Sequence, residues 1–391
     1  MLASPAIYAI GTAVPANKIS QAEHFSILES ANGLSREEKI RIRKVYSHSG
    51  IDYRYSVLPE FGQEDHADNI IFNPANHRPS AGVSVRMSLY EKHAAELCEQ
   101  AVRSCVAQLD DDLLSQVTHL VTFSCTGMYA PGLDIQLVQR LGLAYSVERT
   151  CINFMGCYAG INALKTAHHI AVAIPNAVIL VTGVEICTIH YRKSEEQDQV
   201  VANALFADGA AACVVSRKKL KRDCENEINP GRSELPTVRP NNVILAMTNF
   251  YSEFDPAGND EMVWRIGDLG FELRLSSYVP MLIRKSIFGL VEKLFAKAGI
   301  AQADIAFYAL HPGGRKILEV CEEALHISKE ANKYSYEVLQ NYGNMSSVTI
   351  FFVLQKMLQS FSNDDEGKRM LACAFGPGLT MESMIMEIAH A

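Results

Sequence analysis

The sequence predicts an α/β protein in which layers of helices and sheet are stacked. The chain has 391 residues, 48% of them hydrophobic and 20% charged, which is typical of a soluble globular protein large enough for a sizeable core. Short, nearly continuous apolar runs alternate with segments of helical periodicity. Runs of this kind are typical of strands buried on both faces, and their alternation with helices places sheet between helical layers.

Each predicted element follows from one of these two patterns. Apolar runs with the length of a strand occupy 119–127, 176–186, 210–216, 242–250, 305–314 and 369–378. Helical spacing of apolar residues occupies 85–109, 159–173, 279–298, 316–325 and 348–361. The N-terminal "IYAIGTAVPAN" predicts one more strand that ends in a Gly/Pro turn.

The domain organisation predicted is one unit made of two related halves, 1–230 and 231–391. Residues 218–241 are rich in charge, Pro, Asn and Gly, and are the best candidate for a connector. "NFMGCYAGINALKTAHHIAV" and "NYGNMSSVTIFFVLQKML" each run from a Gly-containing loop into a helix that an apolar strand follows. This weak similarity between the two segments favours an interleaved duplication over two unrelated domains.

Charge and cysteine usage argue against several classes of partner and site, although a local basic patch is still compatible with the sequence. The formal net charge of -8 argues against nucleic acid or an anionic membrane as the partner. The ten cysteines form no C-x-x-C pair and no zinc-like cluster, so we expect no metal and a reducing cytoplasm. The N-terminus lacks the basic region of a signal peptide, and no run approaches the roughly eighteen apolar residues of a membrane span.

Cys157 lies in "NFMGCYAGIN", just before the helical pattern that begins at Ala159. Unpaired backbone N–H groups and the macrodipole at a helix start stabilise a thiolate, and the neighbouring small residues leave room for a bulky acyl group. A packed core thiol is the more frequent role of a cysteine in such a composition. Both interpretations stay open on this stretch alone.

Two other polar residues stand where apolar patterns stop. His311 ends the strand of "YALHPGG", beside a tight turn that permits close approach of a ligand, or else caps the loop. Asn344 in "NYGNMSS" precedes a helix, where an ordinary N-terminal cap is the alternative. G-x-S-x-G, G-x(4)-G-K-[ST] and G-x-G-x-x-G motifs are absent, which disfavours serine hydrolase, phosphate-loop and dinucleotide functions.

Taken together, "NFMGCYAGIN", "LFADGAAA", "LHPGG", "YGNMSS" and "FGPGLTMES" resemble the type III polyketide synthases, the chalcone synthase relatives within the thiolase superfamily. The order and spacing match over nearly the whole chain, and "MVWRIGDLGFEL" is closer to the bacterial branch. The resemblance implies a thiolase-like α-β-α-β-α fold with two pseudo-duplicated halves. It also implies a homodimer that uses an acyl-CoA starter and malonyl-CoA, with no cofactor beyond these thioesters.

Carried onto this sequence, the family's nucleophile falls on Cys157, its histidine on His311 and its asparagine on Asn344. The resemblance implies a thiolate–imidazolium ion pair, acyl transfer to sulfur, decarboxylation of malonyl-CoA, and cyclisation to a pyrone or a resorcinol-type phenol. Its two aromatic gatekeepers fall on Phe206 and Phe271, for which ordinary core packing is the alternative.

The remaining positions concern substrate binding. The basic entrance that meets coenzyme A phosphates falls on Arg41, Lys44 and His48, where a solvated helix face is the alternative. The cavity positions fall on Cys125, Thr126, His190, Met262 and Ser346. His190 and Met262 replace a Thr and a Gly of the plant chalcone enzyme, and Ala130 replaces a Met that reaches into the partner subunit's cavity. These departures argue against a chalcone product.

Two other functions share part of this pattern. A single-round β-ketoacyl synthase with a carrier-protein malonyl donor shares a Cys, a His and an Asn in the same order. A non-catalytic partner subunit that shapes a cavity is the non-enzymatic alternative, although it has little reason to keep all three residues.

Overall fold

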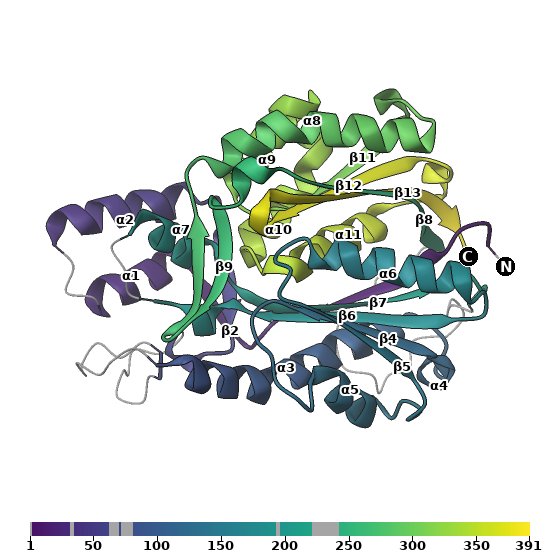
Figure 1. Ribbon diagram of the computed structural model, residues 1–391, viewed down its shortest axis with the longest axis horizontal. Helices are drawn as coiled ribbons and strands as arrows, with labels where there is room; N and C mark the ends of the chain where they lie inside the picture. Colours follow the sequence, from purple (N-terminus) through teal and green to yellow (C-terminus); the bar gives the residue numbers. More distant parts are fainter. Residues whose placement is uncertain (1, 32–34, 62–69, 72–80, 193–195, 221–241) are drawn as a thin grey trace.

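A computed structural model describes residues 2–31, 35–61, 70–71, 81–192, 196–220 and 242–391. Its described part has five layers, which run helix, sheet, helix, sheet, helix (Figure 1). The helices are α1 (Gln21–Ala31), α2 (Arg36–His48), α3 (Val83–Val106), α4 (Leu113–Gln116), α5 (Leu133–Leu141), α6 (Ala159–Ala173), α7 (Gln197–Leu205), α8 (Val279–Ala298), α9 (Arg315–Leu325), α10 (Lys333–Tyr342) and α11 (Thr349–Ser360). Helices α8 and α9 cover one outer face, α3 and α5 cover the other, and α6 and α11 fill the middle layer.

Within the described ranges, nine strands form one hydrogen-bonded sheet in the order β11-β12-β13-β8-β1-β7-β6-β4-β5. They are β1 (Ala6–Ala13), β4 (His119–Ser124), β5 (Glu148–Asn153), β6 (Val178–Ile186), β7 (Asp208–Ser216), β8 (Val243–Phe254), β11 (Ile305–Leu310), β12 (Arg369–Gly376) and β13 (Thr380–His390). Two antiparallel pairs complete the described strands, β2 (Asn17–Ser20) with β3 (Tyr53–Ser56) and β9 (Met262–Gly267) with β10 (Gly270–Leu275).

The two halves repeat one topology. In the N-terminal half β4 pairs parallel with β6, β6 antiparallel with β7, and β7 antiparallel with β1. In the C-terminal half β11 pairs parallel with β12, β12 antiparallel with β13, and β13 antiparallel with β8. The predicted layered α/β fold with two related halves is confirmed. Most of the predicted connector, and the boundary at 230, lie outside the described residues.

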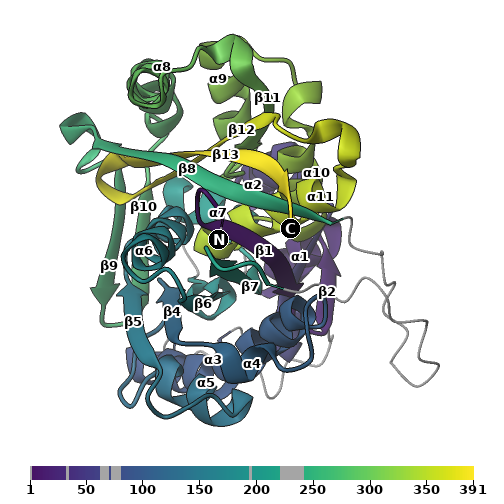
Figure 2. The same cartoon turned by 90° about the vertical axis from the view of Figure 1, so that its right-hand side faces the viewer.

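The two sheet segments meet at β1 and β8, side by side in Figure 2, where Ala6 pairs with Ala246 and Ile7 with Leu245. The middle layer needs small residues, because α6 and the start of α11 approach closely. A Cβ on Gly160 would lie 2.5 Å from the backbone oxygen of Ser347. Only glycine therefore fits at this crossing, which holds the starts of both central helices together.

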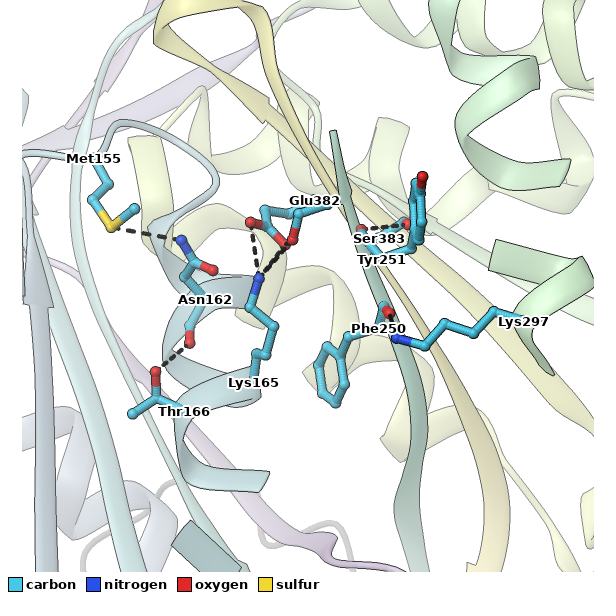
Figure 3. A network of polar contacts seen from close by, with 10 residues as sticks. Met155, Asn162, Lys165, Thr166, Phe250, Tyr251, Lys297, Glu382 and Ser383 are labelled. Carbon is cyan, nitrogen blue, oxygen red and sulfur yellow. Dashed lines mark hydrogen bonds and ion pairs between the residues drawn. The ribbon is translucent and has the colours of Figure 1, made fainter. Parts of the chain in front are cut away.

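An ion pair ties α6 to the C-terminal half (Figure 3). The Nζ of Lys165 lies 2.8 Å from Oε2 of Glu382 on β13 and 2.7 Å from Oγ of Ser252 on β8. Glu382 is buried, and Lys297 of α8 donates to the backbone oxygen of Phe250. Lys165 therefore fixes the helix that follows the candidate nucleophile against two strands of the other half, and Lys297 fixes one of these strands to α8.

The predicted helices 159–173 and 279–298 agree with α6 and α8 residue for residue. Strand β5 was missed because five of its six residues are exposed, so it has no apolar run. Of the described helices, none combines the length and apolar character needed to cross a membrane.

Candidate active site

One cavity collects the sequence-predicted catalytic and substrate-binding residues from both halves. Its lining contains Cys125, Thr126, Cys157, His190, Phe206, Met262, Phe271, His311, Asn344 and Ser346. The three residues predicted to bind coenzyme A, which are Arg41, Lys44 and His48, do not line it. They are exposed along α2, which packs against the cavity-lining helix α7.

Cys157 lies two residues before α6, in a loop that only glycine can shape. Gly156 has φ +86°, and a Cβ there would lie 2.1 Å from Cδ of Pro377. A Cβ on Gly376 would lie 3.2 Å from the backbone nitrogen of Cys157. The "FGPG" turn of the C-terminal half is thus packed directly on the cysteine loop, which explains why the two motifs occur together.

His311 follows β11 and is almost fully buried, with 1% exposure. Its backbone N–H donates to Cys373 O over 2.8 Å, which fixes the end of the strand. Neither ring nitrogen has a hydrogen-bond partner among the described residues. Burial lowers the pKa of His311 to about 3, so the imidazole is neutral at neutral pH and can accept a proton.

The amide of Asn344 is oriented by its neighbours. Oδ1 accepts from the backbone N–H of Ser346 over 2.8 Å, and Nδ2 donates to Gly313 O over 3.1 Å. Because a backbone N–H can only donate, this contact identifies the oxygen of the amide and leaves the second N–H of Nδ2 available. The backbone of Asn344 bridges to Phe206, since Asn344 N donates to Leu205 O and Ala207 N donates to Asn344 O.

The ion pair expected between Cys157 and His311 is not among the contacts of the described residues. Cys157 Sγ lies 3.5 Å from Oγ of Ser346. Burial raises the pKa of Cys157 to about 12 and lowers that of His311, so both groups are pushed toward their neutral forms. The physical reason is that the apolar cavity penalises a charge on either group, which sequence alone could not show.

An aromatic wall surrounds Phe271. The ring of His190 stacks on it with centroids 4.3 Å apart and planes at 13°, and Trp264 meets it edge-on. His190 Nε2 lies 2.7 Å from Thr126 O, and Nδ1 accepts from Phe271 N over 3.2 Å. Both ring nitrogens have hydrogen-bond partners, and burial lowers the pKa of His190 to about 3. The imidazole is therefore a neutral part of the cavity wall with a fixed orientation.

Sequence reasoning missed a buried glutamate that holds one side of the cavity. Glu185 accepts from Cys125 N over 3.0 Å and from Thr126 Oγ1 over 2.9 Å, and it also accepts from Ser347 Oγ. Burial raises its pKa. Its position at the end of the apolar run "VILVTGVEI" was the available sign, because a carboxylate in a buried strand needs partners.

Comparison with known proteins gives the family. The sequence models of the chalcone and stilbene synthases match this chain, the N-terminal domain over residues 3–218 and the C-terminal domain over residues 246–389. The chain belongs to this family. Among relatives, it is 30% identical over 351 residues to the alpha-pyrone synthesis polyketide synthase-like protein Pks18 of Mycobacterium tuberculosis, covering 90% of this chain and 83% of that one.

Solved structures of type III polyketide synthases agree with the family. The PKS-I structure from the brown alga Ectocarpus siliculosus has a TM-score of 0.84 and 27% identity, covering 99% of both chains. The C-terminal type III polyketide synthase domain of Steely1 from Dictyostelium has a TM-score of 0.82 and 26% identity, covering 98% of this chain and 99% of that chain. The predicted thiolase-like fold and family are therefore confirmed.

Proposed function

We propose that this type III polyketide synthase condenses an acyl-CoA starter with malonyl-CoA on Cys157 and releases a cyclised pyrone or resorcinol-type phenol. The observation that carries the proposal is His311, whose two buried ring nitrogens lack partners among the described residues, in the same cavity as Cys157 and Asn344. Buried polar atoms are rarely left unpaired, and an acyl-transfer site is one place where they are needed.

The first step is transfer of the starter to the cysteine. Sγ of Cys157 attacks the thioester carbonyl while His311 accepts the thiol proton, because the histidine is neutral before the reaction. The carbon–sulfur bond to coenzyme A then breaks, and the proton leaves with the coenzyme A thiol. The product is a thioester on Cys157.

Chain extension needs donors for a developing oxyanion. The free N–H of Asn344 Nδ2 and a ring N–H of His311 are suited to the thioester oxygen of malonyl-CoA. Loss of carbon dioxide leaves an enolate, whose α-carbon attacks the carbonyl on Cys157 and frees its sulfur. The chain is two carbons longer, and it stays bound to coenzyme A.

The walls of the cavity support this sequence of steps. Phe206 and Phe271 are proposed to exclude water from the enolate, and Arg41, Lys44 and His48 to meet the phosphates of coenzyme A outside the cavity. Cys125, Thr126, His190, Met262 and Ser346 are proposed to shape the acyl chain. The similarity to Pks18, named for alpha-pyrone synthesis, favours a pyrone as the product class. No cofactor beyond the thioesters is part of this proposal.

We further propose a homodimer formed through β5 and a cytoplasmic location. β5 lies at one edge of the sheet and is largely exposed, which is the arrangement of a strand that pairs with another chain. The nine cysteines within the described ranges are all free thiols, as expected in a reducing compartment.

The test uses Cys157→Ala with acyl-CoA starters and malonyl-CoA, followed by mass spectrometry. We expect loss of chain extension with malonyl-CoA decarboxylation retained, because Asn344 and His311 still stabilise the enolate. Full extension by Cys157→Ala would contradict the proposal. If every product has been extended only once, and forms only when the malonyl group is attached to a carrier protein, the enzyme is instead a single-round ketoacyl synthase.

A further inference from the structure

Part of the cavity wall is polar and comes from α1, β3 and α7, none of which carries the proposed catalytic residues. It consists of His24, Arg54, Gln199 and Asn203. His24 and Arg54 are each only 3% exposed. Buried titratable side chains in a cavity call for an explanation, and the mechanism proposed above uses neither of them.

Arg54 is held by hydrogen bonds in every direction. Nε and Nη2 donate to Gln21 Oε1 over 3.1 and 2.7 Å, and Nη1 donates to the backbone oxygens of Asn203 and Phe206 over 2.7 and 2.8 Å. The fifth N–H, on Nη2, points at Nδ1 of His24, 2.5 Å away. Within the described residues no carboxylate lies within 4.0 Å of this guanidinium, although Asp208 attracts it from farther off.

This arrangement sets the tautomer of His24. A guanidinium can only donate, so Nδ1 of His24 must be the acceptor and the ring proton must be on Nε2. Desolvation and the charge of Arg54 lower the pKa of His24 well below its usual value, so the ring stays neutral. The rings of Tyr46 and Phe61 lie 5.6 and 4.9 Å from that of His24 and hold it in place.

The result is an oriented hydrogen-bond donor in a largely apolar cavity. The Nε2–H of His24 has no partner among the described residues, while the ring is nine-tenths buried and lines the cavity. A hydrocarbon packed against this donor would leave it unsatisfied. An oxygen atom there would satisfy it and would also lie near the positive charge of Arg54.

We propose that His24 Nε2–H binds an oxygen of the acyl chain, so that the enzyme selects chains with a carbonyl or carboxylate oxygen at this point over plain hydrocarbons. The inference rests on the proposed function. The oxygen belongs either to the starter or to a keto group of the growing chain, and the two sources share the same chemistry.

The experiment compares wild type, His24→Phe and His24→Gln with two CoA starters of equal length, a straight-chain acyl-CoA and its ω-carboxyacyl counterpart. Release of coenzyme A measures loading of Cys157, and mass spectrometry measures product length. If the oxygen belongs to the starter, we expect wild type to load the ω-carboxyacyl-CoA about 5- to 150-fold faster than the straight-chain acyl-CoA, the factor that corresponds to leaving one buried donor unsatisfied. His24→Phe loses this discrimination, and His24→Gln, which can still donate, retains part of it.

The stage at which selection is lost identifies the source. Loss of the starter preference during loading assigns the oxygen to the starter. Unchanged loading with shorter products in His24→Phe assigns it to the growing chain. His168→Phe is the matched control, because His168 is a partly buried histidine on α6 outside the cavity lining, and it should behave as wild type.

The inference is overturned if wild type and His24→Phe share both starter preference and product length. If His24→Phe does not fold, the same comparison is made with His24→Leu, and an unchanged starter preference together with an unchanged product length overturns the inference. Malonyl-CoA decarboxylation and chain extension by wild type are measured in parallel. If wild type neither decarboxylates malonyl-CoA nor extends a chain, the proposed function is wrong. If wild type does both, the results for the His24 variants test the inference alone.

Discussion

Replacing Gly156 by alanine tests how the cysteine loop is built. Gly156 combines φ +86° with a Cβ position 2.1 Å from Cδ and 2.9 Å from Cγ of Pro377. The left-handed backbone costs an alanine about 1–2 kcal/mol. Forcing a methyl group into the packed contact adds about 1–3 kcal/mol. We expect the free energy of unfolding to fall by about 2–5 kcal/mol.

Gly142 provides the matched control. It has φ +65° at the end of α5, and nothing lies within 4 Å of the Cβ it would carry. Gly142→Ala therefore has the backbone cost without the clash, and we expect a loss of about 1–2 kcal/mol. Pro377→Ala removes the two atoms that clash, so Gly156→Ala should cost less in that background, with a coupling of about 1–3 kcal/mol.

Urea unfolding of the four variants measures these terms, and the rate of Cys157 acylation measures their effect on chemistry. We expect acylation by Gly156→Ala to be slower by about 100-fold, because the strained loop displaces the sulfur by a fraction of an ångström to an ångström. Equal stability losses for Gly156→Ala and Gly142→Ala would refute the packing argument. So would a Gly156→Ala cost that Pro377→Ala leaves unchanged.

Three further predictions concern charge and assembly. Alkylation of Cys157 by iodoacetamide should accelerate throughout pH 7–9, since burial raises its pKa to about 12; a plateau from pH 6 would reveal a preformed ion pair instead. The folded-state pKa of His311, about 3, lies below its usual 6.5, so stability is full above pH 6.5 and falls as the pH drops toward 3. Urea unfolding at several pH values gives the dependence of the free energy of unfolding on pH below pH 6.5. This dependence should be shallower in His311→Gln than in wild type by up to about 1.4 kcal/mol per pH unit, and an equal dependence in both proteins would refute the prediction. Cys151→Arg places like charges on the exposed β5 edge and should weaken self-association by about 1 kcal/mol in sedimentation, whereas an unchanged dimer would exclude that edge.

The sequence predicted the central elements because burial leaves a local pattern. Strands β4, β6 and β7 are buried on both faces, so their sequences are nearly continuous apolar runs. In α6 and α8 the apolar residues have helical spacing over the full length of the helix. Strand β5 and the β9–β10 pair were missed, because partly exposed strands with mixed side chains have neither pattern. Their positions are determined by neighbouring strands far away in the chain.

The same distinction applies to the candidate site. Cys157, His311 and Asn344 lie where apolar patterns stop, so their positions were visible in the sequence, although only the resemblance connected them. His24 and Arg54 were missed because they lie on short peripheral elements. Nothing in "AEHF" or "DYRYS" shows that backbone oxygens of α7 and of Phe206 accept from Arg54, or that the rings of Tyr46 and Phe61 flank His24.

Burial also decides how the proton of Cys157 must move. A thiolate and an imidazolium formed in the apolar cavity would each bear a desolvation cost, and their mutual attraction must exceed both costs for a resting ion pair to exist. Transfer of the proton to His311 during attack on the thioester avoids a resting thiolate, because the imidazolium forms only as negative charge develops on the carbonyl oxygen. Asn344 Nδ2 has a free N–H for that oxygen. We therefore propose that acyl transfer starts from a neutral Cys157–His311 pair, with the amide of Asn344 oriented toward the developing oxyanion.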